Sequence, residues 1–324
     1  MTPSDTAGPS PDPAGPTPGP LGPPLLIGNP RAGRDRGRVL REMSAALHAR
    51  GAAHDVAETR SAGDATRLAR QAVAAGRRFV VAVGGDGTVH EVVNGLIDPV
   101  TGTPHGADTV LGVVPGGTGG DLARTFGFDR RPEVGVRHLL GDATAPFDVG
   151  RVTLTGLDGA ERTVLFANIA EAGYGGLVTR LANRLPARLG TARYGVAIVA
   201  GVVRFRLVET EVTLDTGAHV REPLSNVIVA NGQFFGGGLK AAPRALPWNG
   251  RLNVQTWSGS PTDVLRAGQK LRHGTHTELP EVREWQASTV TIDGPPLVVE
   301  ADGEVLGTTP ARFDLLPAAL SIKL

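Results

Sequence analysis

Residues 84–88 read Gly-Gly-Asp-Gly-Thr and directly follow the apolar run Phe79–Val83. The following residues, 89–94, suit a helix, so the glycines join a buried strand to a helix N-terminus. Glycines let the backbone come close to a bulky anion, and a helix N-terminus adds free N–H donors and partial positive charge. Asp86 places a carboxylate where a metal bound to phosphates could use it. The stretch therefore predicts a nucleotide phosphate site.

Strands and helices alternate on both sides of this stretch. Short apolar segments at 25–27, 54–56, 79–83 and 109–114 are separated by helical patterns, and Ser61–Asp64 resembles a capping box that opens one of the helices. Continuous apolar strands between helices predict an α/β domain whose parallel sheet is covered on both faces. Ligands of such sheets bind beyond the carboxyl ends of the strands. The loops at 29–33, 84–88 and 115–121 should therefore converge on one cleft.

The pattern changes after about Asp148. One helical region, at about 177–203, interrupts a series of β-branched or alternating segments. These segments are 151–154, 163–169, 207–214, 226–230, 252–257, 289–292 and 297–299. They predict a second, mainly antiparallel β domain.

Further carboxylates accompany the glycine loops. Pro115–Arg124 again joins a buried strand to a helix, with the hydroxyl of Thr118 and the carboxylate of Asp121 among its glycines. One acidic glycine loop is weak evidence, but two at neighbouring strand ends favour a phosphate site with a metal. Asp148 is either a third carboxylate for that metal or a polar hinge residue. Asp302-Gly303-Glu304 reads as a turn by itself, and beside these loops it offers a general base.

Histidine 90 and the loop at 236–241 have plainer interpretations. His90 is expected to be a surface or positioning residue rather than a catalytic one. The Gly236–Ala241 segment loosely fits a dinucleotide fingerprint, but Pro243 and Pro247 follow, so a helix cannot start there properly. A loop facing the cleft is expected instead.

Composition narrows the class of protein. The chain has 324 residues, a net charge of +1 and no cysteine, which argues against a nucleic-acid binder and excludes thiolate chemistry. Residues 1–24 are rich in proline and glycine, so we expect a disordered tail without the features of a signal peptide. The longest apolar run, Tyr194–Val203, is too short to span a bilayer. A cytoplasmic protein without a transmembrane segment is the default expectation.

These motifs together resemble the diacylglycerol kinase catalytic family, which includes soluble bacterial diacylglycerol kinases, other lipid kinases and sphingosine kinases. The resemblance runs from Leu25 to Leu324 and rests on an ordered set of short motifs. The motifs are Asn29-Pro30-Arg31-Ala32-Gly33, Gly84-Gly85-Asp86-Gly87-Thr88 with Glu91 and Asn94, Gly117-Thr118 with Asp121-Leu122-Ala123-Arg124, Asn231-Gly232, Gly236-Gly237-Gly238, Ala242-Pro243, and Asp302-Gly303-Glu304. NAD kinases share the first glycine loop, but the ordered set is specific to lipid kinases.

The resemblance implies a nucleotide-binding domain like that of NAD kinase and phosphofructokinase at 25–148, and a β-sandwich lipid-binding domain at 149–304. Residues 305–324 are expected to return to the first domain. ATP would lie between the domains with Mg²⁺ on its phosphates, and the acid–base residue falls on Asp302 or Glu304. The nucleotide contacts implied by family position are Asn29, Pro30, Arg31, Ala32, Gly33, Thr59, Gly84, Gly85, Asp86, Gly87, Thr88, Glu91, Gly117, Thr118 and Asp121.

The proposed reaction is phosphoryl transfer from ATP to a lipid hydroxyl, in which Asp86, Asp121 and Asp148 anchor Mg²⁺. The partner would be a lipid substrate met through transient contact with a membrane surface, and a homodimer is left open. Two departures from the family allow alternatives. Gly120 stands where the family usually has Asn, and Asn249 stands where an acidic residue often helps to build a structural magnesium site. These departures leave a catalytically inactive nucleotide-binding regulator as an alternative to the lipid kinase. The shared first glycine loop leaves an NAD kinase-like enzyme as another.

Overall fold

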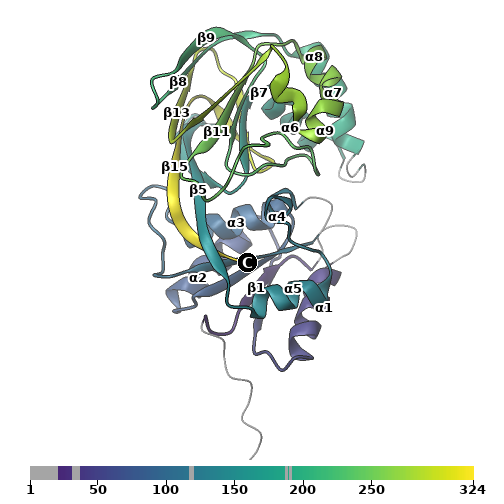
Figure 1. Ribbon diagram of the computed structural model, residues 1–324, viewed down its shortest axis with the longest axis vertical. Helices are drawn as coiled ribbons and strands as arrows, with labels where there is room; N and C mark the ends of the chain where they lie inside the picture. The colour runs from purple at the N-terminus through teal and green to yellow at the C-terminus, as the bar shows by residue number, and fades with distance from the viewer. Residues whose placement is uncertain (1–20, 31–36, 117–119, 187–188, 190–191) are drawn as a thin grey trace, which may run out of the picture.

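Four parallel strands form the centre of the N-terminal lobe in a computed structural model of the protein (Figure 1). The structure describes residues 21–30, 37–116, 120–186, 189 and 192–324. The strands lie in the order β2-β1-β3-β4. Their bounds are β1 Leu25–Gly28, β2 Asp55–Glu58, β3 Phe79–Gly84 and β4 Val110–Pro115. Their carboxyl ends share one edge of the sheet, where the loops after β1, β3 and β4 begin.

Helices cover both faces of this sheet. They are α1 Arg38–His48, α2 Asp64–Ala74, α3 Asp86–Leu96, α4 Asp121–Phe126 and α5 Pro132–Leu140. Successive strand residues point to opposite faces, so Val81 packs in the core with α1 and α5, while Val80 packs in the core with α2 and α3. This two-sided burial explains why the strands are apolar throughout.

The C-terminal lobe is built mainly from antiparallel strands around one large apolar core. Its strands are β5 Thr144–Gly156, β6 Glu161–Phe166, β7 Ile169–Gly173, β8 Val208–Leu214, β9 His219–Leu224, β10 Asn226–Ala230, β11 Leu252–Trp257, β12 Val282–Ala287, β13 Thr289–Asp293, β14 Val298–Ala301 and β15 Glu304–Lys323. Its helices are α6 Tyr174–Arg184, α7 Ala192–Arg204, α8 Pro261–Arg266, α9 Gly268–His273 and the 3₁₀ helix η2 Thr275–Glu278. The predicted fold class, an α/β lobe followed by a β-rich lobe, is confirmed.

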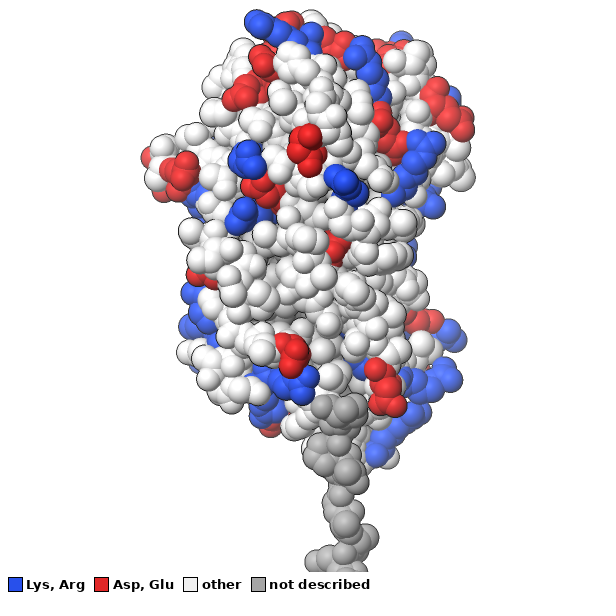
Figure 2. All heavy atoms as spheres, turned by 60° about the vertical axis from the view of Figure 1, so that its left-hand side comes forward, with Lys and Arg blue, Asp and Glu red and all other residues white. Residues whose placement is uncertain are grey.

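The long strands β5 and β15 run from one lobe to the other. β15 pairs antiparallel with β5 along most of its length, and its end pairs in parallel with β4 through Ser321 and Ile322. Figure 2 shows this side of the molecule, where acidic and basic side chains are interspersed at both ends and the middle is largely uncharged. No single-sign field covers that face, as expected from the near-neutral composition. Among the residues that the structure describes, no helix is both long enough and apolar enough to cross a bilayer.

Several local predictions need correction. Ser61 does not cap α2: the N-cap is Gly63, and the carboxylate of Glu91 accepts hydrogen bonds from the backbone N–H groups of Gly63 and Ala65, both at 3.0 Å. The helical region predicted at 177–203 is two separate helices: α6 ends at Arg184, and α7 begins at Ala192. The predicted tail lies largely outside the described residues, which begin at 21.

Candidate functional site

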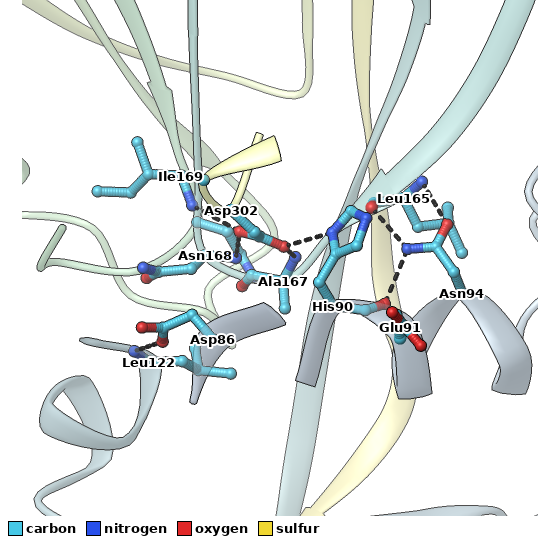
Figure 3. Close-up of polar contacts among 12 residues, drawn as sticks. Asp86, His90, Glu91, Asn94, Leu122, Leu165, Ala167, Asn168, Ile169 and Asp302 are labelled. Carbon is cyan, nitrogen blue, oxygen red and sulfur yellow. Dashed lines mark hydrogen bonds and ion pairs between the residues drawn. The ribbon is translucent and has the colours of Figure 1, made fainter. Parts of the chain in front are cut away.

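Helix α3 carries three polar side chains, Asp86, His90 and Asn94, on one face. They are four residues apart, so they lie above one another along the helix. Figure 3 shows them pointing to three different partners: Asp86 toward the start of α4, His90 toward Asp302, and Asn94 toward Leu165. One helix thus contacts the start of α4 in its own lobe and both Asp302 and Leu165 in the C-terminal lobe.

The carboxylate of Asp86 holds the start of helix α4. Its Oδ2 accepts a hydrogen bond from the Gly120 N–H at 2.9 Å, and its Oδ1 accepts from Asp121 at 2.8 Å and Leu122 at 3.2 Å. These amides would otherwise be unsatisfied at a helix N-terminus. Gly120 is left-handed, with φ 85°, a conformation that a glycine adopts without strain. Asp86 therefore fixes the end of the loop that begins at Pro115.

Asp121 continues this chain of contacts. Its Oδ2 accepts a hydrogen bond from Gly237 N–H at 2.8 Å, which holds the 236–238 loop against α4. Its Oδ1 is buried and has no hydrogen-bond partner among the residues that the structure describes, although Arg124 Nε lies 3.5 Å away. Burial raises the pKa of Asp121, the Gly237 amide offsets part of this effect, and the negative charge of Asp86 raises it further.

Asp302 lies in a left-handed turn, with φ 51°, between β14 and β15. Its Oδ1 accepts hydrogen bonds from Asn168 N–H at 2.9 Å and Ile169 N–H at 3.2 Å. Its Oδ2 accepts from Ala167 N–H at 2.8 Å and lies 3.0 Å from His90 Nδ1. The carboxylate is 1% exposed. Four donors therefore hold it in one orientation at the junction between the lobes.

His90 is buried, so the expectation of a surface position is wrong and the expectation of a positioning role remains open. Burial lowers its pKa, but the hydrogen bond and the negative charge of Asp302 outweigh that effect, so the pKa is raised overall. Burial disfavours the charged imidazole, whereas the carboxylate of Asp302, 3.0 Å away, favours it.

A second pair of carboxyl groups, Glu171 and Glu300, was not predicted from the sequence. They occupy directly opposite positions on β7 and β14, and both are buried. Burial raises the pKa of Glu171 to about 7. It also raises the pKa of Glu300 well above its usual range, and the charge of Glu171 adds to this. Glu300 Oε2 accepts a hydrogen bond from Gly303 N–H at 2.9 Å, so the pair borders the Asp302 turn. The sequence feature that could have revealed this pair is a single acidic residue within each of two otherwise apolar strands.

The first glycine loop is shorter than predicted, because α3 already begins at Asp86. A Cβ on Gly84 would come within 2.4 Å of Thr88 Oγ1, so glycine is required there for the tight turn. A Cβ on Gly87 would meet no atom of the described residues within 4 Å at the first turn of the helix. Gly85 is the N-cap residue.

The remaining predicted contacts separate into three groups. Thr59 is buried at the end of β2, where its N–H donates to Gly28, and Asn29 and Pro30 follow β1 at the same edge. Glu91 faces α2, where its two oxygens cap the helix as described above. The predicted contacts Arg31, Ala32, Gly33, Gly117 and Thr118 lie outside the described residues.

Asp148 and Asn249 are engaged elsewhere. Asp148 is buried in β5, where its Oδ2 accepts from Gly250 N–H at 2.8 Å and its Oδ1 from Ala318 N–H at 2.7 Å. It thereby ties the loop near Asn249 to β15. Asn249 is exposed, and its Oδ1 accepts a hydrogen bond from the backbone of Arg251 at 3.0 Å. Glu304 is exposed, in contrast to Asp302.

A divalent cation on bound phosphates fits one place better than the others. Among the described residues, no group of three or more His, Asp or Glu side chains is arranged to hold a metal by itself. The buried Oδ1 of Asp121, which accepts no hydrogen bond within the described part of the chain, lies near the charge of Asp86, and a hard cation would satisfy this arrangement. Ligands from phosphate and water would complete such a site.

Comparison with known proteins identifies both lobes. Residues 23–152 match the diacylglycerol kinase catalytic domain, and residues 168–324 match the YegS C-terminal NAD kinase beta sandwich-like domain. A diacylglycerol kinase of Mycobacterium tuberculosis is 33% identical over 263 residues, which cover 81% of each chain. A protein of Pseudomonas putida named "Probable lipid kinase YegS-like" is 32% identical over 279 residues, covering 83% of this chain and 85% of that protein.

A solved structure of a diacylglycerol kinase from Bacillus anthracis str. Sterne has the same fold, with a TM-score of 0.67 at 20% identity. The match covers 93% of this chain and 96% of that one. The chain belongs to the diacylglycerol kinase catalytic family and is a lipid kinase.

Proposed function

We propose that the protein transfers the γ-phosphate of ATP to a hydroxyl group of a diacylglycerol-type lipid. The observation that carries this proposal is one face of helix α3. On it lie Asp86, whose carboxylate holds the start of α4, and His90, which contacts Asp302. A phosphate donor site and a proton acceptor are thereby fixed to one rigid element. Such positioning is the main requirement of phosphoryl transfer.

The nucleotide phosphates would lie at the first turn of α3. The N-terminal amides of a helix and the space beside Gly87 suit a group that approaches the backbone closely. Gly120 and the start of α4 would close the other side, since Asp86 holds their backbone amides. Asn29 and Thr59 lie at the same sheet edge and would contact the nucleotide.

Mg²⁺, when bound, would neutralise negative charge on the phosphates. Asp121 would hold it through Oδ1, either directly or through water, and the charge of Asp86 would favour its binding. The other oxygen of Asp121 keeps the 236–238 loop in place through Gly237. Asp148 is less suited to this task, because both of its oxygens already accept backbone hydrogen bonds.

Asp302 would receive the proton of the lipid hydroxyl. Its two oxygens have about four lone-pair sites, and four donors already approach them. Three of these donors are backbone amides, and only His90 can turn away without movement of the main chain. We therefore infer that Oδ2 is the atom that accepts the proton, with His90 as a positioning residue. Glu304, exposed and two residues away, is the competing base.

Two isosteric variants test this assignment. Asp302→Asn is expected to lower kcat by about 10²- to 10⁴-fold, because the amide cannot take the proton, whereas Glu304→Gln should lower it by less than about tenfold. Labelled ATP and dispersed diacylglycerol provide the assay, and equilibrium binding of ATP provides the control for an intact nucleotide site. Full activity in Asp302→Asn together with a large loss in Glu304→Gln would assign the base to Glu304.

A further inference from the structure

Helix α7 exposes a row of valines on the outer side of the C-terminal lobe, beside α6 and α8 (Figure 1). The exposed fractions are 53% for Val196, 63% for Val199 and 69% for Val203. Spacings of three and four residues place all three on one face of the helix, which we call the α7 face. Single exposed apolar residues are common, but an aligned row indicates a contact surface.

The opposite face of α7 is firmly packed, so the valines are not exposed by a loose helix. Ala197 and Gly201 are buried, and Ile198 packs against the main core. The hydroxyl of Tyr174, at the start of α6, donates to the backbone oxygen of Ile198 at 2.7 Å. A Cβ on Gly201 would lie 3.0 Å from the Tyr174 ring, which shows how closely the two helices approach. The helix is therefore apolar on two faces, only one of which the protein buries.

Two exposed leucines belong to neighbouring segments. Leu207 follows α7 in sequence, Leu265 lies on α8, which contacts α7, and each is 42% exposed. They add exposed apolar groups near this helix.

Arginines flank the α7 face at both ends. Arg193 lies at its start, with its guanidinium 5.2 Å from the centre of the Tyr194 ring. At its end, Arg204 donates to the backbone oxygen of Ala200 at 3.3 Å, and Arg206 donates to backbone oxygens only. None of the three arginines forms an ion pair with a carboxylate among the described residues. The surface therefore combines an apolar row with positive charge that the protein does not neutralise.

We propose that the α7 face docks the enzyme on a bilayer that contains anionic lipids. An amphipathic helix that lies in a membrane surface has this distribution, with apolar residues in the acyl boundary and arginines at the level of the phosphates. A second copy of the chain is a poorer occupant. A two-fold contact between α7 helices would bring arginines next to arginines, and the helix sequence contains no acidic residue to pair with them.

The position of the α7 face relative to Asp302 suits this task. Strand β7 starts at Ile169, whose N–H donates to Asp302, and it ends next to Tyr174, which contacts α7. A five-residue strand spans roughly 15 Å. Helix α7 adds its own width of about 10 Å, so a lipid drawn from a bilayer at the α7 face would travel about one strand length plus one helix width to reach the carboxylate. The choice of partner depends on the proposed function, because a lipid kinase must meet its acceptor at a membrane.

Sedimentation with vesicles, in the absence of ATP and of acceptor, tests the docking surface. The full-length protein is mixed with phosphatidylcholine vesicles that contain or lack phosphatidylglycerol. Val196→Ser/Val199→Ser/Val203→Ser should reduce the partition coefficient on the anionic vesicles by at least roughly tenfold. Arg204→Gln/Arg206→Gln should reduce it by a similar factor on anionic vesicles only. A matched triple control, Val56→Ser/Val100→Ser/Leu157→Ser, removes exposed apolar groups elsewhere and should bind like the wild type.

Each outcome decides the proposal. Wild-type protein that ignores anionic vesicles, or a valine variant that binds them normally, would overturn it. A wild-type dimer that the valine variant converts to a monomer would replace the membrane by a second copy. Phosphotransfer to diacylglycerol in detergent micelles is measured separately. Transfer without vesicle binding would contradict only the docking surface, and vesicle binding without transfer to any lipid would contradict only the proposed function.

Discussion

Residue Asp302 is held in position by residues that are far from it in the sequence. Three of its donors come from the segment 167–169 and the fourth from His90, which is 212 positions away in sequence. Because three donors are backbone amides, the main chain sets the position of the carboxylate. His90 is the one side chain among the four donors, and it refines the orientation of the carboxylate.

We predict that His90→Ala lowers kcat by about tenfold and changes the KM for ATP little. Asp302 loses one of the four donors that orient it. Burial lowers the pKa of His90, but the hydrogen bond and charge of Asp302 raise it overall, so an inflection of the pH–rate profile that belongs to the imidazole should disappear in the variant. His90→Gln, which can still donate but does not titrate, should recover part of kcat without restoring the inflection. Steady-state kinetics between pH 5 and 9 provide the measurement, and wild-type kcat with a wild-type profile in His90→Ala would show that His90 does not act through Asp302.

The sequence could locate Asp86, Asp121 and Asp302, because glycines and apolar strands next to them mark sheet-edge turns. It could not show what their oxygens contact. The role of Asp86 at the start of α4 and the contact of His90 with Asp302 depend on tertiary structure. Local sequence patterns carry no information about such contacts. Glu171 and Glu300 were missed for a related reason, since pairing β7 with β14 requires the register of the sheet.

Helix α3 is one of the elements that join the two lobes through side chains. Asn94 donates to the backbone oxygens of His90 and Leu165, both at 2.9 Å, and accepts from Leu165 N–H at 3.0 Å. The contact satisfies both backbone groups of Leu165 at the end of β6. It therefore fixes the orientation of α3 relative to the C-terminal lobe.

Replacing Asn94 by alanine should destabilise the protein by about 1–3 kcal/mol, because buried backbone groups of Leu165 lose their partner. Urea denaturation followed by circular dichroism gives the free energy of unfolding. The matched control is Asn249→Ala, which changes an exposed amide and should stay within about 0.5 kcal/mol of the wild type. Equal stabilities for the two variants would contradict the role assigned to Asn94.

Elements with a regular apolar period were found from the sequence, including the four parallel strands and helices α1, α2 and α3. Strands β9 and β12 were missed because polar residues occupy their exposed positions, as in Arg221 and Arg283. Strand β15 was not recognised as one element, since two prolines interrupt its sequence and its pairing shifts register there. Neither feature can be read from local propensity.

The stability of the whole molecule should depend on two buried glutamates of the C-terminal lobe. The sheet holds Glu171 and Glu300 next to each other, and burial raises the pKa of both. Between the ordinary glutamate pKa of 4.5 and about 7, the folded protein keeps a proton that the unfolded chain has released. The free energy of unfolding therefore falls as pH rises through this range.

We predict that this loss is on the order of 3 kcal/mol for Glu171, the equivalent of the pKa difference. Glu171→Gln, which resembles the protonated form, should flatten the stability profile between pH 5 and 7 and be more stable than the wild type at pH 8. Glu161→Gln changes an exposed carboxylate and should leave the profile unchanged. Chemical denaturation at a series of pH values is the assay. A Glu171→Gln profile as steep as that of the wild type would count against the buried pair.

The central claim is that this site moves phosphate from ATP to a lipid. The most direct measurement incubates the protein with Mg²⁺ and γ-labelled ATP, offers a total lipid extract, diacylglycerol or NAD as acceptor, and identifies the labelled product by mass. We predict label in a phosphorylated lipid, strongest with diacylglycerol, and its loss in Asp302→Asn. Label in NAD, or no labelled lipid from protein that binds ATP, would contradict the claim.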